Sequence, residues 1–272
     1  MRRRVRPFAA VVMLAAAVQL AACATRSSAP AAPPAAVGEA VAILDARERT
    51  LTALQSPAVM EYAGPDGHLK ARELITVRRP SSLRVEALTP LGVALVVAAG
   101  PSGIAVFDPA KNTIARGAAT AATLDRVARI PLTPAQAVRL LLALPPDEPA
   151  RAAPPTSAHD DRGAALLSYA RADGAVDQVA FADGDLATVR EIGADGTLLY
   201  EVSYSDYRDI GAMRFPYTIA ARFPASATTL RLRYERPLID GAIPDATFVL
   251  APGPQTRELS LGLNSAPPDA RG

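Results

Sequence analysis

The stretch Leu83-Arg84-Val85-Glu86-Ala87 decides the fold class, because its apolar and charged residues alternate one by one. Successive side chains of a β-strand point to opposite faces of the sheet, so this alternation predicts a strand that is buried on one face. The same period of two recurs in Tyr200-Glu201-Val202-Ser203-Tyr204 and in Leu230-Arg231-Leu232-Arg233-Tyr234. Three such segments, far apart in the sequence, indicate a mainly β protein.

Turn signals separate these and other short apolar segments. They are Pro65-Asp66-Gly67, Gly100-Pro101-Ser102-Gly103, Ala172-Asp173-Gly174, Ala182-Asp183-Gly184 and Ala194-Asp195-Gly196. Glycine, aspartate and proline favour the backbone conformations of tight turns. Because successive turns recur at intervals of about ten residues, they predict an antiparallel meander of about ten to twelve strands rather than alternating strands and helices.

Three helices are predicted within this β-rich chain. Apolar residues recur every three to four positions from Val37 to Leu54, and Pro57 is expected to close this helix. A shorter helix is expected around residues 124–128, ending near Ile130-Pro131. The third begins at Thr133-Pro134-Ala135-Gln136, which is a capping box with proline at the first helical position.

The third helix is expected to stop at Pro145-Pro146, and residues 145–162 are expected to form a long exposed loop. A sheet of about ten strands curls, and its concave face must be covered. Three helices are too few to cover both faces, so we expect them on the concave face as a lid. Beneath the lid, an apolar cavity for acyl chains and an ordinary packed core are both compatible with the sequence.

The N-terminus carries an export signal. Four arginines in residues 2–6 precede an apolar run from Phe8 to Val18, which is shorter than the about 20 residues of a membrane span. The run ends in Leu20-Ala21-Ala22-Cys23, which resembles the lipobox of bacterial lipoproteins. Cys23 is the single cysteine of the 272 residues. We therefore expect cleavage before Cys23 and lipid on its thiol.

This processing divides the chain into four predicted parts. Residues 1–22 form the signal peptide, residues 23–36 the lipidated cysteine and a tether, residues 37–262 one folded domain, and residues 263–272 a disordered tail. Ala24, where an aspartate would be an inner-membrane signal, is typical of an outer-membrane address. We expect a periplasm-facing chain that is anchored to the outer membrane by acyl chains such as palmitate.

Composition and motifs argue against several function classes. Without residues 1–22 the chain has 25 basic and 27 acidic residues, so no basic surface for nucleic acid is expected. A single cysteine cannot form an internal disulfide. His68 and His159 are the only histidines, and no further His or Cys completes a metal site. We predict neither an enzyme nor a cofactor.

Several motifs resemble one family. They are Arg84-Val85-Glu86-Ala87-Leu88-Thr89-Pro90-Leu91-Gly92, Phe107-Asp108, Ile130-Pro131-Leu132-Thr133, Arg139-Leu140-Leu141-Leu142-Ala143-Leu144-Pro145-Pro146, Ser203-Tyr204-Ser205-Asp206-Tyr207, Phe215-Pro216 and Ile243-Pro244-Asp245-Ala246-Thr247-Phe248. The earlier motifs resemble the outer-membrane lipoprotein receptor LolB, and the later ones its relative, the carrier LolA. The resemblance covers residues 40–260. The chain departs from the receptor in its greater length, its lack of tryptophan and its insertion at residues 145–162.

The resemblance implies an α+β, mainly β fold: an unclosed antiparallel half β-barrel whose helical lid covers a hydrophobic cavity for lipoprotein acyl chains. It also implies that Leu91, between Pro90 and Gly92, projects on a loop that inserts into the membrane. The alternative for Leu91 is a place beneath the lid helix. We expect the cavity to be lined by Leu83, Val85, Val97, Val138, Leu141, Leu142, Tyr200, Val202, Leu230 and Leu232.

The expected function is that of a non-enzymatic lipoprotein that binds acyl chains and aids the localisation or insertion of other lipoproteins. Expected partners are acylated lipoproteins or other lipids, the membrane, and a periplasmic carrier protein; we expect a monomer. Two alternatives stay open: a periplasmic glycolipid or phospholipid shuttle of the same fold, and a structural envelope lipoprotein whose half-barrel is filled.

Overall fold

The computed structural model describes residues 34–146, 154–159 and 165–262. The first part of the chain contains α1 (Pro34–Thr50), β1 (Ala53–Gly64), β2 (Gly67–Arg78), β3 (Ser82–Thr89), β4 (Gly92–Gly100), β5 (Gly103–Asp108), β6 (Thr113–Gly117), α2 (Ala121–Ala128) and α3 (Pro134–Leu141). The second part contains β7 (Thr156–His159), β8 (Ala165–Ala170), β9 (Val176–Ala182), β10 (Asp185–Ile192), β11 (Leu198–Ile210), β12 (Met213–Phe223), β13 (Thr228–Tyr234), β14 (Leu238–Ile239) and β15 (Arg257–Ser260), with short 3-10 turns at Pro224–Ser226 and Asp245–Phe248.

The described strands form one open sheet. Its order is β15-β6-β5-β4-β3-β2-β1-β13-β12-β11-β10-β9-β8-β7, and β14 pairs with β1 beside this path. Each half of the chain forms a meander, and the antiparallel pairing of β1 with β13 joins the two. The only parallel pair among the described strands is β15 with β6. The prediction of an unclosed, mainly antiparallel sheet is confirmed.

The sheet has 15 strands, more than the ten to twelve expected. The excess comes from the short strands β7, β14 and β15, which have four, two and four residues. Segments of this length are too short to show a period of two. The predicted turns at Pro65-Asp66-Gly67 and Gly100-Pro101-Ser102-Gly103 connect β1 with β2 and β4 with β5, and the three Ala-Asp-Gly turns connect β8 through β11.

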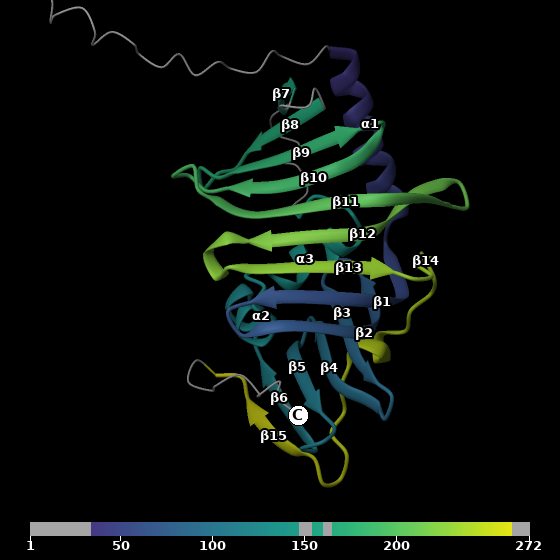
Figure 1. Ribbon diagram of the computed structural model, residues 1–272, viewed down its shortest axis with the longest axis vertical. Coiled ribbons are helices and arrows are strands. Elements are labelled where there is room, and N and C mark those ends of the chain that lie inside the picture. Colours follow the sequence, from purple (N-terminus) through teal and green to yellow (C-terminus); the bar gives the residue numbers. More distant parts are fainter. Residues whose placement is uncertain (1–33, 147–153, 160–164, 263–272) are drawn as a thin grey trace, which may run out of the picture.

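One face of the sheet is covered by the helices (Figure 1). In β2, Ile75 and Val77 are buried and belong to the main apolar cluster, whereas Lys70 and Arg72 point to the exposed outer face. Leu44 of α1, Leu124 of α2 and Val138 of α3 belong to the same cluster. We call the face that carries Ile75 and Val77 the inner face. The helices therefore cover the inner face, as the lid prediction requires.

The two short helices lie where the sequence predicts them. Thr133 caps α3 through its side chain, which accepts a hydrogen bond from the Gln136 N–H, while the Gln136 side chain accepts from the Thr133 N–H. The side chain of Thr120 caps α2 by accepting from the Thr123 N–H. These caps satisfy backbone N–H groups that have no partner inside a helix.

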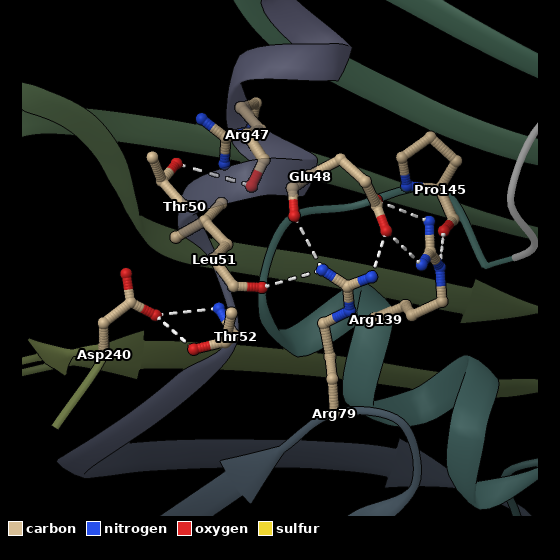
Figure 2. A network of polar contacts seen from close by, with 9 residues as sticks. All are labelled: Arg47, Glu48, Thr50, Leu51, Thr52, Arg79, Arg139, Pro145 and Asp240. Atoms are coloured by element: carbon tan, nitrogen blue, oxygen red, sulfur yellow. Dashed lines mark hydrogen bonds and ion pairs between the residues drawn. The ribbon is translucent and has the colours of Figure 1, made fainter. Parts of the chain in front are cut away.

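The prediction that the first helix extends to Leu54 is wrong, because α1 ends at Thr50 and Leu54 lies in β1. Instead of continuing the helix, the backbone N–H of Thr52 donates to the carboxylate of Asp240 at 2.8 Å (Figure 2). The N–H of Ala53 donates to the same carboxylate at 3.2 Å. Pro57 accordingly lies within β1 and does not terminate a helix. A residue about 190 positions away in the chain ends this helix, which no local pattern shows.

The prediction of an exposed loop over residues 145–162 is wrong at two places. Pro145 and Pro146 are buried, and Thr156–His159 forms β7, which pairs with β8. Pro145 is held because its carbonyl accepts a hydrogen bond from Arg139. Residues 147–153 and 160–162 of the predicted loop lie outside the described residues.

The predicted N-terminal tether is wrong at its end, because α1 already begins at Pro34. The signal peptide 1–22, the lipidation site Cys23, the rest of the tether and the tail 263–272 lie outside the described residues. None of the described helices is long and apolar enough to cross a membrane.

Candidate functional site

The ten residues predicted to line a cavity lie in one apolar cluster between the inner face and the helices. Six of them are buried members of the cluster: Leu83, Val138, Leu142, Tyr200, Val202 and Leu232. Four are partly buried and pack against it: Val85, Val97, Leu141 and Leu230. Residues from both meanders and from α3 thus meet in this cluster, because the strand register places them on the inner face and α3 packs against that face.

Two hollows that the described residues line lie away from this cluster. A hollow of about 640 Å³ lies mainly over the outer face and is bordered by Lys70, Arg222 and Arg231, with Leu230 the one predicted lining residue at its border. A second hollow, of about 500 Å³, is bordered by Arg78, Arg79 and residues 241–244. Val138 and Leu142 have no exposed surface, so this end of α3 packs closely on the apolar cluster.

A buried charge cluster holds α1 against α3 and the β2–β3 turn (Figure 2). Both carboxylate oxygens of Glu48, on α1, accept hydrogen bonds of 2.9 Å from the guanidinium of Arg139, on α3. Arg79, in the turn after β2, pairs with the same carboxylate and donates to the Glu48 carbonyl at 2.7 Å. The three side chains are only 9–22% exposed. Two-fold pairing of this kind compensates the desolvation of each charge.

The last turn of α3 is held by side chains from the sheet and from α1. Tyr204 donates to the carbonyl of Leu140 at 3.1 Å, and Tyr234 donates to that of Leu141 at 3.0 Å. A helix leaves its last four carbonyls without internal partners, so these hydroxyls satisfy groups that would otherwise be buried unpaired. Burial raises the pKa of both tyrosines above their ordinary value, so both hydroxyls stay protonated and continue to donate.

Arg47, on α1, also binds a backbone carbonyl just after α3. Its Nε donates to the carbonyl of Ala143 at 3.0 Å, and its Nη1 donates to that of Arg214 at 3.2 Å. Burial lowers the pKa of Arg47, mainly by desolvation. We call Arg47, Glu48, Arg79, Arg139, Tyr204 and Tyr234 the closure cluster, because its contacts join both helices to the sheet over the apolar interior.

Sequence reasoning missed the closure cluster. Charged residues on amphipathic helices, such as Glu48 and Arg139, are usually solvated, and nothing in their local sequence distinguishes them. Tyr204 and Tyr234 offer a signal, since they alternate with Val202 and Leu232 and so belong to a buried face. The hydrogen-bond partner of Tyr204, from α3, is 64 residues away in the chain.

The predicted loop Pro90-Leu91-Gly92 forms the tip of the β3–β4 hairpin. Leu91 is 100% exposed, so it does not lie beneath a lid helix. Gly92 has a φ of +123°, which lets the chain turn at this point. Leu88 and Val93 face each other across the hairpin and are each 38% exposed. No charged residue occurs between Glu86 and Asp108, so the tip is a continuous apolar projection.

The two histidines lie apart, His68 in β2 and His159 in β7. No group of three or more His, Cys, Asp or Glu side chains that could hold a metal occurs in the part of the chain that the structure describes.

Neither a protein-family model nor a curated protein matches the sequence. Solved structures do match. A LolA superfamily protein from Nitrosomonas europaea has 15% identity and a TM-score of 0.52, over 78% of this chain and 97% of that chain. A DUF1329 family protein from Desulfovibrio piger has 12% identity and a TM-score of 0.50, over 79% of this chain and 96% of that chain. At these identities the likeness shows the fold: the chain has the LolA-like open β-barrel with a helical lid, as its motifs predicted.

Proposed function

We propose that this chain is a non-enzymatic lipoprotein, anchored to the outer membrane through Cys23, that binds acyl chains and aids the localisation or insertion of other lipoproteins. Its partners are acylated lipoproteins, the membrane and a periplasmic carrier that delivers the cargo. The fold shared with a LolA superfamily protein supports an acyl-chain ligand, since the motifs that resemble LolB and LolA lie on that fold.

The observation that carries the proposal is the exposed apolar tip at Leu91. A fully exposed leucine, flanked by two partly exposed apolar residues on a charge-free hairpin, is unfavourable in water. Burial of its apolar surface in a membrane or against acyl chains would gain about 25 cal/mol per Å². A tip of this kind on a protein that is itself tethered to a bilayer supports contact with lipid.

The contacts of the closure cluster hold the lid on the sheet and break when the interior opens. Acyl chains enter when α1 and α3 separate from the sheet, which exposes the apolar inner face to the ligand. The separation breaks polar contacts, whereas the apolar surface it uncovers is covered again by the acyl chains. The polar groups of the closure cluster can bind water when the lid moves, and acyl chains can replace the apolar contacts that Val138 and Leu142 lose.

The experiment replaces Leu91 by Glu and follows the localisation of outer-membrane lipoproteins in cells. We expect impaired delivery with unchanged folding, because Leu91 makes no packing contact to lose. The matched control is Leu238→Glu, since Leu238 is also exposed (65%) but lies in β14. Normal delivery by the Leu91→Glu variant would remove the tip from the function.

The close packing of the apolar interior favours a second candidate, a structural envelope lipoprotein with a filled half-barrel. Mass spectrometry of lipids that co-purify with the protein distinguishes the two. Acylated peptides or lipoproteins support the proposal, and glycolipid or phospholipid alone supports a shuttle of the same fold. A protein that carries no lipid, together with unchanged lipoprotein localisation when the gene is deleted, supports the structural role.

A further inference from the structure

Glu73 is a carboxylic acid on the inner face of the sheet. It precedes Ile75 and Val77 on β2 by two and four residues, so all three side chains point toward the helices. Glu73 is 5% exposed, Ile75 2% and Val77 0%. A glutamate therefore occupies a position in the row of residues that forms the apolar interior.

This carboxyl group has no partner in the part of the chain that the structure describes. No hydrogen bond or ion pair joins Glu73 to any described residue, whereas Glu48 on α1 has two arginine partners. Burial alone raises its pKa to about 7 from an ordinary 4.5, with no contribution from a neighbouring charge. Its carboxyl oxygens keep a small contact with solvent, because they are not among the fully buried side-chain atoms that lack a hydrogen bond in the described residues. A largely buried carboxyl group without a partner from the protein still calls for an explanation.

The neighbours of Glu73 on the inner face are small. The register places Ala58 of β1 and Ala87 of β3 directly beside it. Ala71 is the next residue toward the β1–β2 hairpin on the same face of β2. Methyl groups thus lie beside the carboxyl group on three sides, and α3 contacts both β2 and β3. Because these side chains are small, the polar group of a ligand can reach the carboxyl group when the helices separate from the sheet.

We propose that Glu73 binds the head of the acyl chain: its protonated carboxyl group donates a hydrogen bond to the carbonyl oxygen of a fatty ester or amide whose tail lies along the inner face. This inference rests on the proposed function and deepens it, since it assigns the polar group that positions the ligand. A neutral acid is suited to an ester or amide carbonyl, because that group brings an acceptor and no charge into the apolar interior.

The test uses the full chain, held in an amphipathic polymer, with a bound fluorescent fatty acid as reporter. Three competitors of similar length displace it: methyl palmitate, N-methylpalmitamide and octadecane. At pH 6 we expect the ester and the amide to bind about tenfold more tightly than the alkane, which corresponds to one hydrogen bond in an apolar site. The ester and amide arms show which kind of head group the site prefers.

Variants assign this preference to Glu73. Glu73→Leu should bind octadecane as the native protein does and lose the preference for carbonyl compounds, whereas Glu73→Gln should keep part of it because its amide can still donate. The control is Glu61→Leu, which removes an exposed glutamate from the outer face of the adjacent strand. Thermal unfolding of each variant confirms that it is folded.

Two results would overturn the inference in different ways. If the native protein binds all three competitors equally well, or if Glu73→Leu keeps the preference, Glu73 does not bind the head group and acyl-chain binding stands. If the reporter does not bind the native protein at all, acyl-chain binding fails, and the role of Glu73 fails with it.

Discussion

Two glutamates, one on α1 and one on the inner face of β2, lie in opposite environments. Glu48 is bound by Arg139 and Arg79, and its side chain is 19% exposed. Glu73 is 5% exposed and has no partner among the described residues. A paired buried carboxylate can stabilise a helix contact, whereas an unpaired one costs free energy in the folded chain. The site of Glu48 holds the lid, whereas the site of Glu73 is available to a ligand.

The largest expected effect comes from breaking the paired site. Arg139→Leu leaves Glu48 with Arg79 as its one ion-pair partner among the described residues and removes the contact to the Pro145 carbonyl. We expect the free energy of unfolding to fall by about 3 kcal/mol, within the range for breaking a buried pair. Urea unfolding measures this loss. In the double variant Glu48→Leu, Arg139→Leu, we expect a loss of unfolding free energy that is smaller than the sum of the losses in the two single variants. A loss equal to that sum, or larger, would contradict the pairing.

The unpaired site should respond in the opposite direction. Because burial raises the pKa of Glu73 to about 7, the unfolded chain ionises first as the pH rises above 4.5. The native protein therefore loses stability between about pH 4.5 and 7, and the loss is complete above pH 7. Glu73→Gln has no such titration and should be more stable than the native protein by about 3 kcal/mol at pH 8, because the pKa of Glu73 rises from 4.5 to about 7.

This difference between Glu73→Gln and the native protein should disappear at pH 4, where the carboxyl group is protonated in both states. Unfolding in urea at pH 4, 6 and 8 measures it. A constant difference across this range would show that Glu73 ionises as it does in water.

The smallest expected effect concerns the neutral contacts of the closure cluster. Tyr204→Phe removes the hydroxyl that donates to the Leu140 carbonyl and leaves the ring in place. We expect a loss of about 1 kcal/mol in unfolding free energy, and faster amide exchange in α3. Tyr217→Phe is the matched control, since that tyrosine is stacked by Arg208. Equal effects of the two variants would remove Tyr204 from the closure cluster.

Local patterns predicted much of the fold. The alternation around Val85, Val202 and Leu232 identified buried strand faces, because the period of two follows from backbone geometry alone. The capping box at Thr133 placed the start of α3 correctly, because its hydrogen bonds involve only residues close together in the chain. The end of α1 was missed, because Asp240 determines it from another part of the chain.

The candidate site was predictable in its apolar part and not in its polar part. Leu91 lies at an exposed tip, where the Pro90-Leu91-Gly92 sequence indicated a hairpin turn. The position of Glu73 on the buried face follows from the sequence, because Ile75 and Val77, two and four residues later on the same strand, point to the same side. Its lack of a partner, by contrast, is a property of the assembled interior.

By itself the sequence determined the longer alternating strands, their apolar sides and the hairpin turns between them, since these depend on neighbours along the chain. The tertiary structure alone decided that Arg139 and Arg79 share Glu48, that tyrosines of two strands hold the last turn of α3, and that Glu73 is left unpaired. The partners in these contacts lie far apart in the chain, so only the packing of the helices on the sheet brings their charges and hydroxyls within hydrogen-bonding distance.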